Sequence, residues 1–213
     1  MPRALRMDDR ARERARRHLM RRDPVIGGVV RSAGPCRMRR RASAYAFLVR
    51  SVLYQQLAGS AARAIERRFH AHFGGGVPPA AVLAQASPTA LRSLGLSRQK
   101  AAAVRSIGEA FRDGHVRPAR FAWMTDEEVV ADVTAIRGVG EWTAHMLLMS
   151  CLERPDVLPF GDYGVRKGAR DLYGLPELPD RAGLEAIAEP WAPYRSVASW
   201  YLWRATETVV PGA

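Results

Sequence analysis

The residues with the clearest chemical potential stand in one stretch, from Thr125 to Tyr173. Within it, Gly138-Val139-Gly140 is predicted to join two helices through a tight turn, because glycine tolerates positive φ angles and close backbone approach. Such a turn leaves uncovered N–H groups at the start of the second helix, where the helix dipole also favours negative charge. The hairpin is therefore a candidate site for a phosphate oxygen, with Val139 anchoring the turn or meeting a sugar. An ordinary helix–helix connection with a glycine cap is the alternative.

One acidic residue, Asp162, follows the hairpin in a loop marked by Pro155, Pro159 and Gly161. Taken alone, it is predicted to be the N-cap of a helix that begins near Tyr163, since aspartate accepts hydrogen bonds from the first N–H groups of a helix. The same donors fix the carboxylate and favour its ionised form, which suits a group that acts through its charge. A structural role for Asp162 as a helix cap is therefore compatible with a chemical role for its carboxylate.

Helices must position these residues. Apolar residues recur at three- and four-residue spacing from Tyr45 to Leu57, which predicts one buried helical face, with Gly59 as a candidate interruption. Thr125 with Glu128 fits a capping box. The β-branched runs are short and follow the helical period, so the chain is predicted to be all-α, with roughly ten helices. The predicted helical ranges are 3–22, 25–33, 43–73, 79–85, 89–94, 98–114, 125–138, 141–153, 161–173, 181–188 and 196–209.

The charge of the chain is unevenly distributed. The 213 residues carry a formal net charge of +12. Residues 1–41 hold 14 arginines against 4 acidic residues, a balance of +10, so the basic character is concentrated in an N-terminal arm. A basic arm indicates nucleic acid or another anionic surface as partner. A solvated, frayed helix is the alternative.

Other features of the composition exclude whole classes of protein. No apolar run approaches the roughly 20 residues that cross a bilayer. The N-terminus lacks the apolar segment of a secretory signal. The two cysteines, Cys36 and Cys151, make neither a disulfide framework nor a metal cluster, so a reducing cytoplasm is expected.

Several motifs occur in order along the chain: IRGVGEWTAHMLL at the hairpin, DVLPFGDYGVRK around Asp162 and YRSVASWYLWR near the C-terminus, with Gln-Gln-Leu at 55–57 and LGLSRQKAAAV at 94–104. Together they resemble the helix-hairpin-helix (HhH-GPD) DNA glycosylase superfamily. The likeness is strongest to the 3-methyladenine DNA glycosylase II branch, in a short form without its N-terminal β domain. The resemblance implies two helical lobes around a DNA-binding cleft. It divides the chain into a basic helical arm over 1–22 and a glycosylase domain over 23–213.

The resemblance implies hydrolysis of the bond between a damaged base and deoxyribose, with Asp162 as the catalytic carboxylate. The transition state resembles an oxocarbenium cation, which a fixed carboxylate stabilises while it orients or deprotonates the attacking water. Bifunctional members place a lysine just after the hairpin, where this chain has Trp142. Because no amine is present there to form a Schiff base, we expect a monofunctional enzyme that removes alkylated purines such as 3-methyladenine and 7-methylguanine.

The resemblance also implies a base pocket. Trp142 and Trp203 match pocket aromatics of the family, and Tyr45 is a weaker candidate. Alkylated bases carry a positive charge that attracts electron-rich rings once the base has left the duplex. Met146 stands one turn after Trp142, where the family usually has an aromatic residue, so the substrate range stays open. The alternative for each aromatic residue is a place in the core.

The implied DNA contacts begin at the hairpin, with Arg137, Gly138, Val139, Gly140 and Thr143. Gln56 matches the wedge, the side chain that fills the gap left by the flipped nucleotide, and Leu57 shares that role or packs inside. Arg166 and Lys167, just after Asp162, contact phosphate or form a solvated face.

The expected partner is double-stranded DNA that contains damaged bases, bound by a monomer in a bacterial cytoplasm at the nucleoid. No metal or organic cofactor is expected, apart from a monovalent cation that some family members hold at the hairpin carbonyls in DNA complexes. Two other functions stay open. One is a glycosylase for deaminated, etheno or oxidised bases, and the other is a non-catalytic helix-hairpin-helix protein that binds DNA through the hairpin and the arm.

Overall fold

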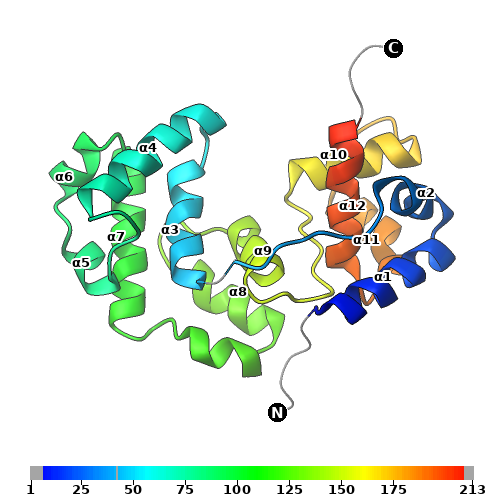
Figure 1. Ribbon diagram of the computed structural model, residues 1–213, viewed down its shortest axis with the longest axis horizontal. Coiled ribbons are helices and arrows are strands. Elements are labelled where there is room, and N and C mark those ends of the chain that lie inside the picture. Colours follow the sequence, from blue (N-terminus) through cyan, green and yellow to red (C-terminus); the bar gives the residue numbers. More distant parts are fainter. Residues whose placement is uncertain (1–6, 42, 209–213) are drawn as a thin grey trace. The chain divides into compact units, whose positions relative to one another are not determined.

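The computed structural model describes residues 7–41 and 43–208, and these divide into two compact units. Residues 41–147 form one, called the central unit here. Described residues up to 40, together with those from 148 onward, form the other, called the terminal unit. Over the described residues every regular element is a helix, twelve α and two 3₁₀, so the all-α prediction is confirmed (Figure 1). None of these helices is both long enough and apolar enough to cross a bilayer.

Helix α7 (Arg98–Arg112) organises the central unit. It packs against α3 (Ala44–Tyr54), α5 (Ala80–Gln85) and α6 (Pro88–Ser93), and α3 in turn packs against α4 (Gly59–His72). The close approach of α5 depends on Gly108, because a Cβ there would lie 2.6 Å from the backbone nitrogen of Ala84. The 3₁₀ helix η1 (Pro118–Trp123), which the sequence did not predict, leads into α8 (Asp126–Thr134). Helix α9 (Glu141–Ser150) follows the hairpin.

The helical region predicted over 43–73 is two helices rather than one. Gln55 leaves the helical conformation with ψ of 133°, and Gln56 has a φ of +54°. These two residues end α3 four residues before Gly59, the residue that the sequence indicated as the interruption. The break creates a short exposed loop at 56–58, where the wedge was predicted.

Helix ends follow their capping residues. Thr125 and Glu128 form both hydrogen bonds of the predicted capping box, at 3.2 and 2.7 Å. Gly174 ends α10 (Tyr163–Tyr173) with a φ of +65°, in the left-handed conformation that glycine adopts without strain. The capping prediction and the predicted end of this helix are confirmed.

Helix α12 (Arg195–Thr208) organises the terminal unit. It packs against α10, α2 (Pro24–Ala33) and α1 (Asp9–Arg22). Helix α11 (Arg181–Ala188) and the 3₁₀ helix η2 (Glu189–Trp191) complete the unit (Figure 1). The core of this unit includes Leu19, Ile26, Val165, Trp191 and Tyr201, all of them buried.

The basic N-terminal helix belongs to this core. Helix α1 begins at Asp9, after the N-cap Asp8, and buries Ala11, Ala15 and Leu19. The apolar positions of this segment are sparse in sequence, but alanine suffices where helices approach closely. The described part of the segment is therefore a packed helix, and the alternative of a frayed, solvated helix is wrong for residues 9–22.

A buried carboxylate joins three elements of the terminal unit. Asp23 is 5% exposed and caps α2 by accepting hydrogen bonds from the N–H groups of Val25 and Ile26. Its other oxygen accepts hydrogen bonds from the Tyr173 hydroxyl and from the indole N–H of Trp191. Burial, together with this bond to the carboxylate, raises the pKa of Tyr173 well above its usual range. Asp23 thus ties α2 to α10 and to η2.

Candidate active site and DNA-contact residues

The hairpin lies between α8 and α9 in the central unit and is held by its glycine and its valine. Gly138 has a φ of +84°, and a Cβ there would lie 2.5 Å from the Cβ of Ala103 on α7. Val139 is 5% exposed and anchors the tip inside the unit. Gly140 has no positive φ and no atom within 4 Å of the position of its Cβ. Only Gly138 therefore needs the conformational freedom that the sequence analysis gave to both glycines.

The hairpin delivers the start of α9 to the surface. The N–H of Ala144 donates to the carbonyl of Gly140 at 3.1 Å and is the first such bond of this helix. The earlier N–H groups of an α-helix have no intrahelical acceptor, which makes this end suitable for an anion. Arg137 is exposed beside it. Thr143 is 2% exposed, so its side chain is buried inside the unit. Only its backbone could contact DNA.

The predicted wedge loop is bonded to the hairpin. The side-chain amide of Gln55 donates to the carbonyl of Gly138 at 3.0 Å. Lys100 donates to the carbonyl of Leu53 at 2.9 Å and so holds the last turn of α3, and burial lowers the pKa of this ammonium. Gln56, the residue after these two hydrogen-bonded positions of α3 and its C-cap, is exposed. Gln55 and Lys100 were not predicted as site residues, because nothing in the sequence shows which side chain meets a carbonyl so distant in the chain.

Leu57, next to Gln56, is 38% exposed, so the structure does not bury it as a core residue. Both side chains of the predicted wedge thus stand on the surface of the central unit.

The pocket candidates of the central unit differ in exposure. Trp142 is 43% exposed on α9, and Met146 is half-buried one turn later on the same helix face. Tyr45 packs its ring 5.0 Å from that of Phe111 and donates its hydroxyl to the carbonyl of Pro78 at 2.9 Å. Burial raises the pKa of Tyr45 to about 12. These contacts favour the core alternative for Tyr45, whereas Trp142 presents a ring to the surface.

Asp162 is the N-cap of α10 in the terminal unit, as the sequence analysis predicted. Its Oδ1 accepts a hydrogen bond from the N–H of Val165 at 2.9 Å. The same oxygen accepts the indole N–H of Trp203, on α12, at 2.8 Å. Two donors from two helices therefore fix the direction of this half-buried carboxylate. The structure brings Asp162 and Trp203 into direct contact, 41 residues apart in the chain.

Gly164 makes room for this pair. A Cβ at Gly164 would lie 3.0 Å from Cδ1 of Trp203 and 3.1 Å from Oδ1 of Asp162. A methyl group there would press on both members of the hydrogen bond. Gly164 follows Asp162 in the motif, but the sequence gives no sign that it faces a tryptophan on another helix.

The loop that leads to Asp162 is fastened to the start of α12. Asp156 accepts two hydrogen bonds from the Arg195 guanidinium, at 2.7 and 2.6 Å. The hydroxyl of Ser196 accepts the N–H of Val157 at 2.9 Å and donates to the carbonyl of Arg154 at 2.7 Å. The helix that supplies Trp203 therefore also holds the loop that supplies Asp162.

The two basic residues after Asp162 have partners within the unit. Arg166 donates to the carbonyl of Pro179 at 2.8 Å. Lys167 forms an ion pair with Asp171 at 2.6 Å. Both are half-buried, so a contact with phosphate would have to compete with these bonds.

Neither cysteine forms a disulfide, and both Cys36 and Cys151 are buried. Among the described residues no group of three or more His, Cys, Asp and Glu side chains is placed to hold a metal ion.

The chain is similar to known proteins in sequence and in fold. The HhH-GPD superfamily of base excision DNA repair proteins matches residues 49–193. The chain is 34% identical to DNA-3-methyladenine glycosylase 1 of Schizosaccharomyces pombe over 175 residues. This alignment covers 81% of the chain and 77% of the relative. The solved structure of the S. pombe 3-methyladenine DNA glycosylase Mag1 with abasic DNA superposes with a TM-score of 0.82, at 33% identity, over 92% of this chain and 98% of that one.

A second solved structure, the DNA-3-methyladenine glycosidase of Bacillus halodurans, gives a TM-score of 0.83 at 33% identity, over 91% of this chain and 89% of that one. The range matched by the superfamily, residues 49–193, includes the hairpin and Asp162. The chain therefore belongs to the HhH-GPD superfamily of base excision DNA repair proteins.

Proposed function

We propose that this protein is a monofunctional DNA glycosylase that excises 3-methyladenine and 7-methylguanine from double-stranded DNA. Relatives named as DNA-3-methyladenine glycosylases cover most of the chain, and one of them was solved with abasic DNA. The observation that carries the proposal is the Asp162 carboxylate, held by the start of α10 and by the indole N–H of Trp203.

Asp162 acts on the bond between the base and C1′ of deoxyribose. The bond breaks with its electron pair on the base, so a cationic 3-methyladenine leaves as the neutral base and the sugar becomes an oxocarbenium-like cation. The carboxylate stabilises that charge, and the preset direction of Oδ1 avoids reorganisation during the reaction. Water then adds its oxygen to C1′ and gives up a proton, for which Asp162 is the acceptor before release to solvent. The products are the free base and an abasic site.

The hairpin holds the DNA backbone without reading sequence. The exposed start of α9 supplies N–H donors for a phosphate oxygen, with Arg137 as an adjacent cation. Gln56 and Leu57 fill the space left by the extruded nucleotide. The hydrogen bond from Gln55 to Gly138 links the residue before the wedge loop to the hairpin of the central unit.

Trp142 determines the class of reaction. Its indole offers a stacking and cation–π surface to a cationic base, and it stands where a lyase would carry its amine nucleophile. Excision should therefore leave an intact strand with an abasic site. A methylated base is already a good leaving group, so the pocket needs no strong acid.

The experiment is a release assay with a panel of substrates. Purified protein is incubated with methylated duplex DNA, and free 3-methyladenine and 7-methylguanine are measured. Duplexes with uracil, hypoxanthine, ethenoadenine or 8-oxoguanine are assayed in parallel. Release of methylated purines, with strand breaks only after alkali and no borohydride-trapped adduct, is the expected result.

Excision confined to another lesion of the panel would overturn the proposed substrate. A trapped covalent adduct would overturn the monofunctional class. Binding of duplex DNA without excision of any base would favour the non-catalytic alternative. The proposed partner is duplex DNA and the proposed state is a monomer in a bacterial cytoplasm, although relatives occur in yeast as well as in Bacillus.

A further inference from the structure

We propose that α1 carries a second binding surface for the DNA backbone, separate from the hairpin. It consists of Arg10, Arg14, Arg17 and Arg21, here called the arginine stripe. The inference rests on the proposed function to the extent that DNA is the partner. It adds a contact in the terminal unit that the chemistry at Asp162 does not use.

The four arginines share one narrow face of α1. Their spacing of four, three and four residues places them within roughly 60° around the helix axis, at successive rises of about 6, 4.5 and 6 Å. All four are exposed, while Ala11, Ala15 and Leu19 bury a neighbouring face of the same helix. The stripe is therefore a line of cations about 16 Å long on a packed helix.

The stripe borders a hollow in the surface of the terminal unit. The hollow has a volume of about 820 Å³, and its wall includes the four arginines together with His18 and Tyr194. The His18 ring lies edge-on to that of Tyr194 at 5.3 Å and contacts the carbonyl of Pro190 through Nε2 at 3.0 Å. The contact between His18 and Pro190 ties α1 to η2 at the edge of the hollow.

The acidic residues at the hollow are bonded to other arginines. Asp9 pairs with Arg12 at 2.7 Å, and Glu13 accepts two hydrogen bonds from Arg16, at 2.8 and 3.0 Å. Arg12 also pairs with Glu153 at 3.0 Å. The acids and the arginines beside the stripe thus largely neutralise one another.

The stripe itself keeps its charge. Within the described residues no ion pair involves Arg10, Arg14 or Arg21. Arg17 makes a 3.4 Å contact with Glu13, whose carboxylate is bonded mainly to Arg16, and its side chain is 69% exposed. Among the residues that the structure describes, three of the four cations therefore have no anionic partner and the fourth shares one, which makes the stripe suitable for a polyanion.

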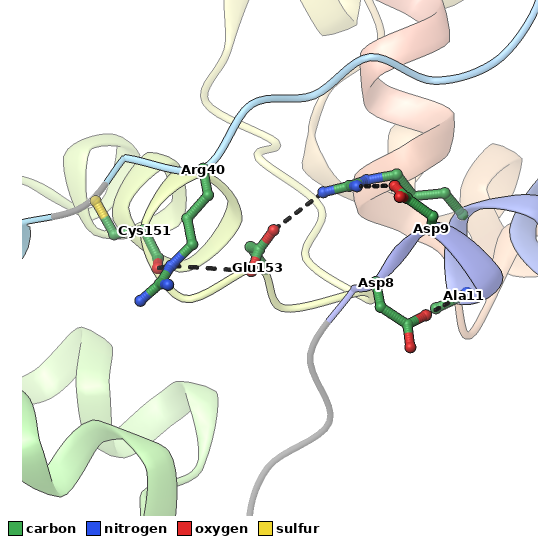
Figure 2. A network of polar contacts seen from close by, with 7 residues as sticks. Asp8, Asp9, Ala11, Arg40, Cys151 and Glu153 are labelled. Carbon is green, nitrogen blue, oxygen red and sulfur yellow. Dashed lines mark hydrogen bonds and ion pairs between the residues drawn. The ribbon is translucent and has the colours of Figure 1, made fainter.

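Anchoring makes the stripe a preorganised ligand site. Asp8 caps α1 by accepting a hydrogen bond from the N–H of Ala11 (Figure 2). The N–H of Met7 donates to the carbonyl of Glu153 at 2.9 Å. Glu153 is itself held by Arg12 and lies 3.9 Å from Arg40. Because α1 is already ordered, the conformational cost of binding is confined to the rotamers of the arginine side chains.

The backbone of DNA is the polyanion that fits best. Guanidinium groups bind phosphate oxygens in pairs of hydrogen bonds, and the rises along the stripe are of the same order as the spacing of phosphates along a strand. The stripe offers guanidinium groups to phosphate oxygens, and contacts with phosphate carry no sequence information. It is therefore expected to raise affinity for any duplex, with or without a lesion.

The test compares charge removed from the stripe with the same charge removed elsewhere. The stripe variant changes Arg10, Arg14, Arg17 and Arg21 to Gln. The control variant changes four scattered exposed arginines to Gln: Arg31, Arg67, Arg92 and Arg120. A third variant changes the stripe to Lys, which keeps the charge. Binding of the full-length proteins to a lesion-free duplex is measured from 50 to 300 mM salt, with circular dichroism as a check on folding.

Each phosphate contact contributes a slope of about −0.9 to log Kobs against log salt. We expect the stripe variant to lose about 2 to 4 from the magnitude of this slope, the control variant to lose less than about 1, and the Lys variant to keep it. Equal losses in the stripe and control variants, or no loss in the stripe variant, would overturn the proposal. A loss in the Lys variant as large as in the Gln variant would assign the stripe a structural role instead.

The duplex carries no damaged base, so this readout does not depend on excision. A wild-type protein that binds the duplex but excises nothing contradicts the proposed function alone. A wild type that excises methylated purines while the stripe variant keeps the full salt slope contradicts the stripe alone.

Discussion

Replacing Trp203 with Phe isolates the hydrogen bond that directs Asp162. Phe keeps an aromatic ring against Gly164 but removes the N–H that donates to Oδ1 at 2.8 Å. A hydrogen bond to a charged group contributes about 1.5–3 kcal/mol, and the half-exposed setting of this one places it near the lower end. Since about 1.4 kcal/mol corresponds to a factor of ten in rate, we expect excision to slow roughly tenfold.

The assay is the single-turnover rate of methylated-base release with protein in saturating excess, so that weaker DNA binding does not enter the rate. Trp200→Phe is the matched control, because it makes the same change in volume on the same helix. The Trp200 ring lies edge-on to Tyr201 at 5.0 Å, and the Arg204 guanidinium sits 5.4 Å from its centre. If Trp203→Phe and Trp200→Phe slow excision equally, or if neither does, the orienting role of the indole N–H is refuted.

Three further predictions concern the scaffold. Gly138→Ala combines a φ of +84° with a 2.5 Å approach to Ala103, so it should lower the free energy of unfolding by about 2–3 kcal/mol in denaturant titration, whereas Gly140→Ala should cost under about 1 kcal/mol. Asp23→Ala leaves the buried Trp191 N–H and the half-buried Tyr173 hydroxyl without their acceptor and removes a helix cap, which should cost about 3–5 kcal/mol by the same measurement. Tyr45, whose pKa burial raises from 10.0 to about 12, stays protonated in the folded state while the unfolded chain ionises. Stability should therefore fall as the pH rises from 10 to 12, and the fall should be smaller in Tyr45→Phe.

Local chemistry made much of the fold predictable. Thr125 begins α8 and Gly174 ends α10 by rules that involve only neighbouring residues, and both helix boundaries were predicted correctly. The break after α3 was placed at Gly59, since glycine is the usual signal. The actual break uses the positive φ of Gln56, a conformation that tertiary bonds at Lys100 and Gln55 sustain. Such bonds are long-range and leave no local pattern.

At the candidate site, too, local features were predictable from the sequence and long-range contacts were not. The sequence placed Asp162 at the start of a helix, and the structure agrees. It could not show that the indole of Trp203 donates to that carboxylate, because the two residues meet only when α10 packs on α12. It also left Arg166 and Lys167 open to phosphate, whereas the structure pairs them with Pro179 and Asp171. The hydrogen-bond and ion-pair partners of these side chains depend on how the helices pack, which the local sequence does not show.

The central claim is that the Asp162 carboxylate performs the chemistry, and Asp162→Asn tests it most directly. Asn is as good an N-cap as Asp and has the same size, so α10 should remain intact. Asp180→Asn is the matched control, since Asp180 caps α11 through the N–H of Gly183 at 2.8 Å in the same unit. We predict that Asp162→Asn slows single-turnover release of 3-methyladenine by about a hundredfold or more while Asp180→Asn does not. Release by Asp162→Asn at a rate within about threefold of the wild type would contradict a catalytic role for this carboxylate.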